Sequence, residues 1–259
     1  AMWAPRFAGK GAEYVQRLRI YPHALREANA YYSPEKVALL FGYFQAETEG
    51  AGDNLPGGMV FNCLSHDVIA HETTHALVDG LHRYYRHETN PDIAAFHEAF
   101  ADIVALFQHF SIPAALRHVI VRTRGDLRKD NMLAELAQQF GQASFGSRAL
   151  RSALGQPPKQ TDYAEATEAH DRGAVLLGAV FQAFLEIYEA RVEDLKRLAT
   201  GGTGVLPEGA IPVDLVNRMA AEAAMAAERV LTVCIRALDY CPPVDLWFCD
   251  YLRALITAD

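Results

Sequence analysis

The sequence of 259 residues has few cysteines and no long basic run. The cysteines are only four and widely scattered, at Cys63, Cys234, Cys241 and Cys249, which is too few for a disulfide framework, so we expect four free thiols. The formal net charge is −8, and no run of lysine and arginine is longer than a couple of residues. This balance argues against nucleic acid or an anionic membrane as the main partner.

Long apolar stretches are also missing. The longest candidate, from Ala174 to Phe184, is interrupted by Gln182 and is shorter than the roughly 18 residues that a membrane span needs. The sequence begins Ala1-Met2-Trp3, without a basic region that leads into an apolar core, so we expect no signal peptide here. We therefore expect no membrane segment, and the sequence leaves the compartment open between cytoplasm and export.

What is present is a globular composition with mostly helical periodicity. Apolar residues make up 51% and charged residues 22% of the chain. Short apolar runs at 37–44 and 59–61 predict strands, while 1–32 is expected to be irregular or helical. Helical patterns follow at about 65–85, 93–110, 173–198 and 212–238, with a final helix after the prolines at 242–243.

The fold class expected from these patterns is α+β and predominantly helical. We expect an N-terminal lobe, 1–160, that holds the small β element and the metal-binding helices argued from the motif below, and a helical C-terminal lobe, 161–259.

The sharpest motif is His71-Glu72-Thr73-Thr74-His75. On a helix, residues four apart lie on the same face, so His71 and His75 can present two imidazoles to one ion. Glu72 can then reach a water on that ion without being a ligand itself. The pattern predicts a zinc site with Glu72 as general base.

A tetrahedral site needs a third protein ligand. In one known arrangement the third ligand is a His six residues after the second. That arrangement requires Gly at position 78 and His or Asp at position 81, whereas this chain has Val78 and Leu81, and His82 comes one position too late. That alternative fails.

A Glu ligand from the following helix fits better. Glu98 lies in an apolar helical segment, with Asp102 one turn further on the same face. Buried carboxylates need a partner, which a metal ion and a ligand imidazole would supply. Glu98 is therefore the expected third ligand, and Asp102 is expected to accept a hydrogen bond from a ligand imidazole.

At this point the chain resembles the thermolysin-like zinc metallopeptidases, which are gluzincins. The similarity extends from Asp67-Val68-Ile69-Ala70 through the two histidines, the Glu98 and Asp102 pair, Ala149-Leu150-Arg151-Ser152 and Ala169-His170-Asp171-Arg172-Gly173, in family order. The resemblance implies a thermolysin-like catalytic domain, one zinc ion, and a peptide or protein substrate.

The resemblance also implies roles for single residues. Arg151 would hold the substrate carbonyl next to the scissile bond, and His170 would stabilise the oxyanion. Glu165 would orient His170, with Glu168 as the competing carboxylate. Tyr85, with Tyr84 as the spare, would assist the same oxyanion. Asn54 would correspond to the edge-strand Asn that binds the substrate backbone.

Two departures from the family pattern limit the resemblance. The family's structural calcium sites rely on acidic clusters after the helix of the Glu ligand, where this chain has Phe107-Gln108-His109-Phe110. Structural calcium is therefore in doubt, although Asp67 is present. The N-terminal β lobe is also mostly absent, so that one wall of the cleft would be reduced, supplied by missing sequence, or formed by a partner.

Three functions remain open at this stage. The first is an endopeptidase. The second is an aminopeptidase, which needs an acidic anchor for the substrate amine near the edge strand, and the stretch 57–62 supplies none. The third is a zinc-bound domain that serves as a binding or assembly module without catalysis.

Overall fold

The computed structural model describes residues 17–48, 54–128 and 157–259, and this part of the chain is mostly helical with one small mixed sheet. The expected fold class, α+β and predominantly helical, is confirmed at that level. One predicted site residue, Arg151, lies outside the described residues together with its neighbours Ala149, Leu150 and Ser152.

The described elements begin with four strands and continue with helices. The strands are β1 (Arg19–Leu25), β2 (Ala30–Ser33), β3 (Ala38–Gln45) and β4 (Met59–Phe61). The helices are α2 (His66–Leu81), α3 (Pro91–His109), α4 (Pro113–Thr123), α7 (Gln160–Glu165), α8 (Ala169–Ala199), α9 (Val213–Ala237) and α10 (Phe248–Ala258). Short 3₁₀ turns are η2 (Asn62–Leu64), η3 (Arg83–Arg86) and η4 (Leu238–Tyr240).

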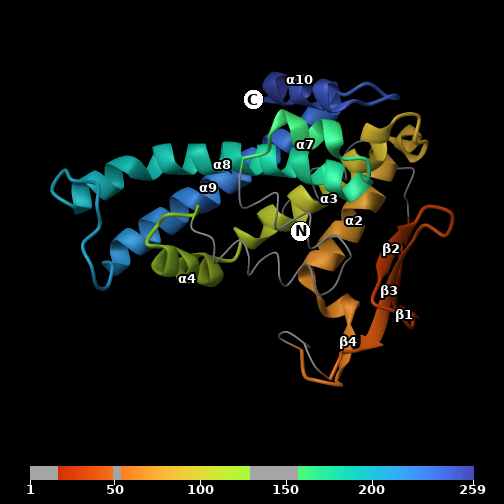
Figure 1. The fold of residues 1–259 in the computed structure, drawn as a ribbon, viewed down its shortest axis with the longest axis horizontal. Coiled ribbons are helices and arrows are strands. Elements are labelled where there is room, and N and C mark those ends of the chain that lie inside the picture. The colour runs from red at the N-terminus through yellow and green to blue at the C-terminus, as the bar shows by residue number, and fades with distance from the viewer. Residues whose placement is uncertain (1–16, 49–53, 129–156) are drawn as a thin grey trace.

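The sheet lies along one side of α2, and the remaining helices stack on the other side (Figure 1). Strand β3 is central: it pairs parallel with β1 and antiparallel with β2 and with β4. The prediction that 1–32 is irregular or helical is therefore wrong for β1 and β2. These strands are short and lack a long apolar alternation of their own, and they form because the buried strand β3 supplies their hydrogen-bonding partners.

Helix α3 forms the centre of the larger core. It begins after Asn90, whose side chain accepts a hydrogen bond from the Asp92 N–H, and Pro91 takes the first helical position. Phe96, Phe100 and other apolar side chains of α3 are almost fully buried against α2 and α8. Burying one such aromatic side chain stabilises the fold by about 1.5–3 kcal/mol, so α3 is a rigid platform for the polar residues that it carries.

This core includes side chains from both sides of residue 160, for example Phe100 and Phe184. A smaller cluster, with Leu39 and Phe41 of β3 and Val68 and Ala76 of α2, joins the sheet to the helices. The division into lobes at 160 stays a prediction.

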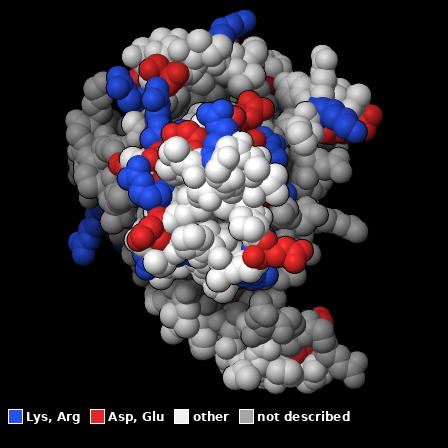
Figure 2. Space-filling view, turned by 90° about the vertical axis from the view of Figure 1, so that its left-hand side faces the viewer, with Lys and Arg blue, Asp and Glu red and all other residues white. Residues whose placement is uncertain are grey.

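Helix α8 is long and apolar enough to cross a membrane by length and composition, and half of its most apolar window is buried inside the structure. Buried core helices meet the same criterion, so the expectation of no membrane segment stays a prediction. At the end of the molecule where α8 meets α9, acidic and basic side chains are mixed around an uncharged centre (Figure 2). Leu198 and Val205 are exposed in this region.

Candidate metal centre

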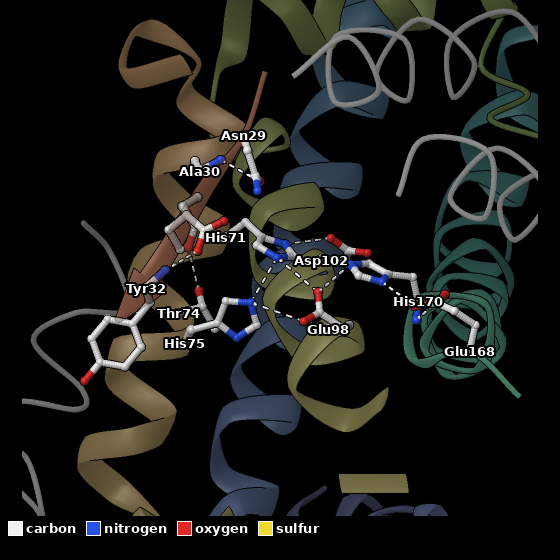
Figure 3. Close-up of polar contacts among 12 residues, drawn as sticks. Asn29, Ala30, Tyr32, His71, Thr74, His75, Glu98, Asp102, Glu168 and His170 are labelled. Carbon is white, nitrogen blue, oxygen red and sulfur yellow. Dashed lines mark hydrogen bonds and ion pairs between the residues drawn. The ribbon is translucent and has the colours of Figure 1, made fainter. Parts of the chain in front are cut away.

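The two motif histidines lie on one face of α2. Their Nε2 atoms are 3.0 Å apart, and the two rings meet edge to face (Figure 3). This arrangement follows from the helical repeat, because side chains at i and i+4 lie one above the other. The expected pair of imidazoles is therefore present in the middle of α2.

Glu98 reaches the same point from α3. One of its carboxylate oxygens is 3.3 Å from His71 Nε2, and the other is 3.7 Å from His75 Nε2. Ligand atoms about 2.0 Å from a tetrahedral zinc ion lie about 3.3 Å from one another. The three separations bracket that value, and one ligand atom from each residue lies within 4.8 Å of the other two. His71, His75 and Glu98 thus fit a metal ion that is held by two imidazoles and a carboxylate.

Asp102 lies behind the first of these ligands. Its carboxylate accepts a hydrogen bond of 2.8 Å from His71 Nδ1, and this contact turns His71 Nε2 toward Glu98. Such an outer partner fixes both the tautomer and the ring orientation of a ligand imidazole. The geometry is the one expected from the sequence for Asp102.

The charges of the three ligands suit a cation. Burial lowers the pKa of His75 to about 3, which leaves a neutral imidazole. Burial opposes the charged form of His71, but hydrogen bonds to Asp102 and Glu98 hold its pKa well above the usual value. Burial likewise opposes ionisation of Glu98, while the surrounding imidazoles hold its pKa well below the usual value. A metal ion at His71 Nε2 would displace a proton from that ring.

Glu72 lies beside the ligands and not among them. Its side chain is buried and lines the cleft into which His71, His75 and Glu98 also face. One of its carboxylate oxygens accepts a 2.8 Å hydrogen bond from the backbone N–H of Tyr32 in β2. Burial raises the pKa of Glu72 to about 7. A bound cation would lower this value, because positive charge favours the carboxylate. The edge strand thus fixes the position of the expected base.

His170 enters the site from the N-terminus of α8. Its Nε2 atom is 3.2 Å from a Glu98 oxygen, and its Nδ1 atom is 2.9 Å from Glu168 Oε1. Hydrogen bonding to Glu98 raises the pKa of His170 to about 9 against the opposing effect of burial, so the ring is a hydrogen-bond donor at neutral pH. His170 is not part of the group that could hold an ion.

The orienting carboxylate of His170 is Glu168, and the prediction of Glu165 is wrong. Glu168 is the N-cap of α8, and its carboxylate accepts hydrogen bonds from the N–H groups of His170 and Asp171. This capping brings the other oxygen to His170 Nδ1. Glu165 is exposed at the end of α7.

The structure also corrects the expectation for Tyr85. Its ring is buried and stacks on His82, and its hydroxyl donates a 2.5 Å hydrogen bond to the Pro242 carbonyl. The hydroxyl is therefore engaged with a carbonyl of the chain, although Tyr85 lines the same pocket as His71 and Glu98. The spare candidate, Tyr84, is half-exposed, and its hydroxyl accepts a hydrogen bond from Arg83.

Asn54 lies in the loop before β4 and is not among the described residues that line the cleft, and its substrate contact stays a prediction. The asparagine next to the cleft is Asn29, at the start of the edge strand β2. Its carbonyl accepts hydrogen bonds from Gly42 N–H and from the Asn62 side chain. A Cβ at Gly42 would collide with that carbonyl, so glycine lets the backbones of β3 and residue 29 approach closely.

The cleft has a volume of about 540 Å³ and is walled by β2 on one side and by α2 and α3 on the other. Sequence reasoning missed two of its polar features. The Tyr32 hydroxyl donates a 2.6 Å hydrogen bond to Asp79, which also pairs with Arg86. The ring of His97 lies beside His75, and its buried Nε2 has no hydrogen-bond partner in the described chain. Neither feature belongs to a motif of fixed spacing.

The buried carboxylate of Asp67, the remaining candidate calcium ligand, pairs with the imidazole of His109 at the end of α3. Within the described residues, no second group of three His, Cys, Asp or Glu side chains has metal-site spacing. Comparisons of the chain with protein-family models, with curated proteins and with solved structures found no match.

Proposed function

We propose that this chain is a zinc-dependent peptidase of the thermolysin-like kind, which hydrolyses peptide bonds within extended polypeptides. The observation that carries the proposal is the convergence of His71, His75 and Glu98 on one point, with the Glu72 carboxylate beside it. Two imidazoles and one carboxylate are a ligand set of catalytic zinc sites, which keep one position open. A bound zinc ion would supply Lewis acidity and would lower the pKa of a bound water to about 7.

The chain's own residues would divide the remaining work. Glu72 would take the proton of the attacking water as the new C–O bond forms, and would deliver it to the amide nitrogen as the C–N bond breaks. His170 would donate a hydrogen bond to the carbonyl oxygen as negative charge develops on it. Its position next to Glu98 and its fixation by Glu168 support this role.

The edge strand supports an extended substrate. Strand β2 pairs with β3 on one side, and in the described chain no strand pairs with its other side. Residues 29–32 line the cleft next to Glu72, and the N–H groups of Ala30 and Tyr32 donate there to Asn29 Oδ1 and to Glu72. An extended peptide can lie along such an edge, and main-chain contacts with it do not require a free terminus. This geometry favours an endopeptidase over an aminopeptidase.

A second candidate is a zinc-bound module without catalysis. It is favoured by the engaged hydroxyl of Tyr85, which leaves the oxyanion with fewer donors than the resemblance implies. Both candidate functions predict a bound zinc ion, and only the peptidase predicts hydrolysis of peptide bonds.

The test is a digest of casein and of N-terminally acetylated peptides by the zinc-loaded chain, with and without a chelator. We expect internal cleavage that stops with the chelator and returns with zinc. Cleavage of free amino termini alone would indicate an aminopeptidase, and zinc binding without any cleavage would favour the module.

The matching variant is Glu72→Gln, with Glu186→Gln on the exposed face of α8 as control. The Glu72 variant should keep its zinc and lose turnover by about 10²–10⁴-fold, the range for loss of a general base. The control should behave as the wild type. Equal activity of all three proteins would remove Glu72 from the mechanism.

A further inference from the structure

Asp92 is a fully buried carboxylate in the first turn of α3, six residues before Glu98. It accepts a 2.6 Å hydrogen bond from Arg172 Nε, hydrogen bonds from the Tyr163 hydroxyl, and a 2.9 Å hydrogen bond from the Phe248 N–H. Buried charges are costly unless they are paired and hydrogen-bonded. Asp92 satisfies that condition through three different elements, α8, α7 and α10.

Arg172 connects this carboxylate to the first turn of α8. Its guanidinium also donates to the Tyr163 and Ala166 carbonyls, and it lies 4.0 Å above the Tyr163 ring. The side chain is largely buried. Since Arg172 follows His170 by two residues, its ion pair with Asp92 ties the helix start that carries His170 to the helix that carries Glu98.

Gly173 shows how close these two helices are. A Cβ at this position would lie 2.8 Å from the Ala95 carbonyl oxygen and 3.4 Å from the Glu98 Cβ. The first turn of α8 therefore rests directly on the backbone of α3 next to the metal ligand. A small displacement of this turn would change the distance between His170 Nε2 and Glu98.

We propose that Asp92, Arg172 and Tyr163 are positioning residues: they clamp the first turn of α8 onto α3 and so hold His170 at its 3.2 Å distance from Glu98. Their catalytic relevance rests on the proposed peptidase function, whereas the clamp itself is a property of the fold. The three residues touch neither the ligand atoms nor the open side of the cleft.

The variant that tests the clamp is Tyr163→Phe. Removal of Arg172 or Asp92 would leave an unpaired buried charge and can prevent folding. Tyr163→Phe deletes only the hydroxyl that donates to Asp92 and keeps the ring under the guanidinium. Tyr188→Phe is the matched control. It deletes a buried hydroxyl from α8 itself, where Tyr188 donates to the Gly125 carbonyl far from His170.

The first readout is independent of activity. Nitrogen-15 NMR of the histidine side chains in the zinc-loaded chain reports each imidazole, and the His170 signals are identified by their loss in His170→Ala. Tyr163→Phe should shift the His170 signals and leave those of His71 and His75 in place. Tyr188→Phe should leave all three unchanged. Unshifted His170 signals in Tyr163→Phe would overturn the clamp.

The second readout is a double-mutant cycle on peptide hydrolysis. Tyr163→Phe should lower kcat by about 10-fold with little change in KM, because small misplacements of catalytic groups are costly. In the His170→Ala background the same substitution should cause no further loss, because both changes act through one side chain. Equal losses in both backgrounds would overturn the positioning role. A wild-type chain without turnover would refute the peptidase proposal, and the NMR readout would still decide the clamp.

Discussion

The two sides of the candidate metal centre are built in different ways. The ligand side consists of two neighbouring helices, and the side chains of His71 and His75 are each only 14% exposed. On the opposite side the His170 side chain is 43% exposed, and its partner Glu168 is 56% exposed. The first side is fixed by helix geometry and core packing. The second depends on a helix cap and on the buried Asp92 cluster.

This difference separates two properties of the site. Holding a metal ion requires only the ligand side, whose atoms already lie at suitable separations. Catalysis would in addition require the side that begins at α8. Variants of the two sides should therefore affect metal affinity and turnover separately, and the following predictions test that separation.

The largest effect is expected for Glu98→Gln. It replaces the carboxylate among the three ligands by a neutral amide. Removing a residue that only hydrogen-bonds to a ligand lowers metal affinity by up to about 100-fold, so the loss of a ligand should lower zinc affinity by more than that. Turnover should be lost with the metal. Chelator competition measures the affinity, with Glu186→Gln as the control. Wild-type affinity in the Glu98 variant would place the metal elsewhere.

His170→Ala should produce the next largest effect, on kcat alone. Loss of one oxyanion donor costs about 10²–10³ in kcat, whereas zinc affinity and KM should stay near those of the wild type. Steady-state kinetics together with zinc titration checks both parts. A large drop in zinc affinity would indicate that His170 is itself a metal ligand and would contradict the separation between metal binding and catalysis.

Asp102→Ala should act on the ligand side with a smaller effect. Without the acceptor for its Nδ1–H, the His71 ring loses its fixed orientation, and zinc affinity should fall by about 10–100-fold. Asp214→Ala, at an exposed position in the first turn of α9, is the control for loss of an acidic side chain. Zinc affinity that is equal in the two variants would contradict the role of Asp102.

Tyr85→Phe should have the smallest effect and should change stability only. The lost hydrogen bond to Pro242 should lower the free energy of unfolding by about 1 kcal/mol, which urea denaturation measures, while kcat should not change. A fall in kcat without a loss of stability would support the oxyanion role that the sequence resemblance implied.

The elements that the sequence predicted well are those set by local periodicity. Strand β4 and helices α3, α8 and α9 appear close to their expected bounds, because apolar spacing marks all four and flanking Pro or Asn residues mark α3 and α9. The convergence of His71, His75, Glu98 and Asp102 could also be anticipated, since each pair lies one helical turn apart on a buried face.

Two of the errors concern contacts that only tertiary structure decides. Strand β2 exists because β3 is buried beside it, and this places Asn29 at the cleft where Asn54 was expected. Tyr85 is held by a carbonyl more than 150 residues further along the chain, and no spacing rule within the sequence reports such a partner. The third error is local: α8 begins at Ala169 and not at 173, and its N-cap Glu168 therefore takes the place expected for Glu165.

X-ray absorption spectroscopy at the zinc edge of the loaded chain tests the central claim most directly. The account predicts one zinc ion with two imidazole nitrogens and oxygen ligands at about 2.0 Å. Sulfur at about 2.3 Å would move the metal to a cysteine, and a third imidazole would place His170 in the open position. Either result would contradict a catalytic centre built on His71, His75 and Glu98.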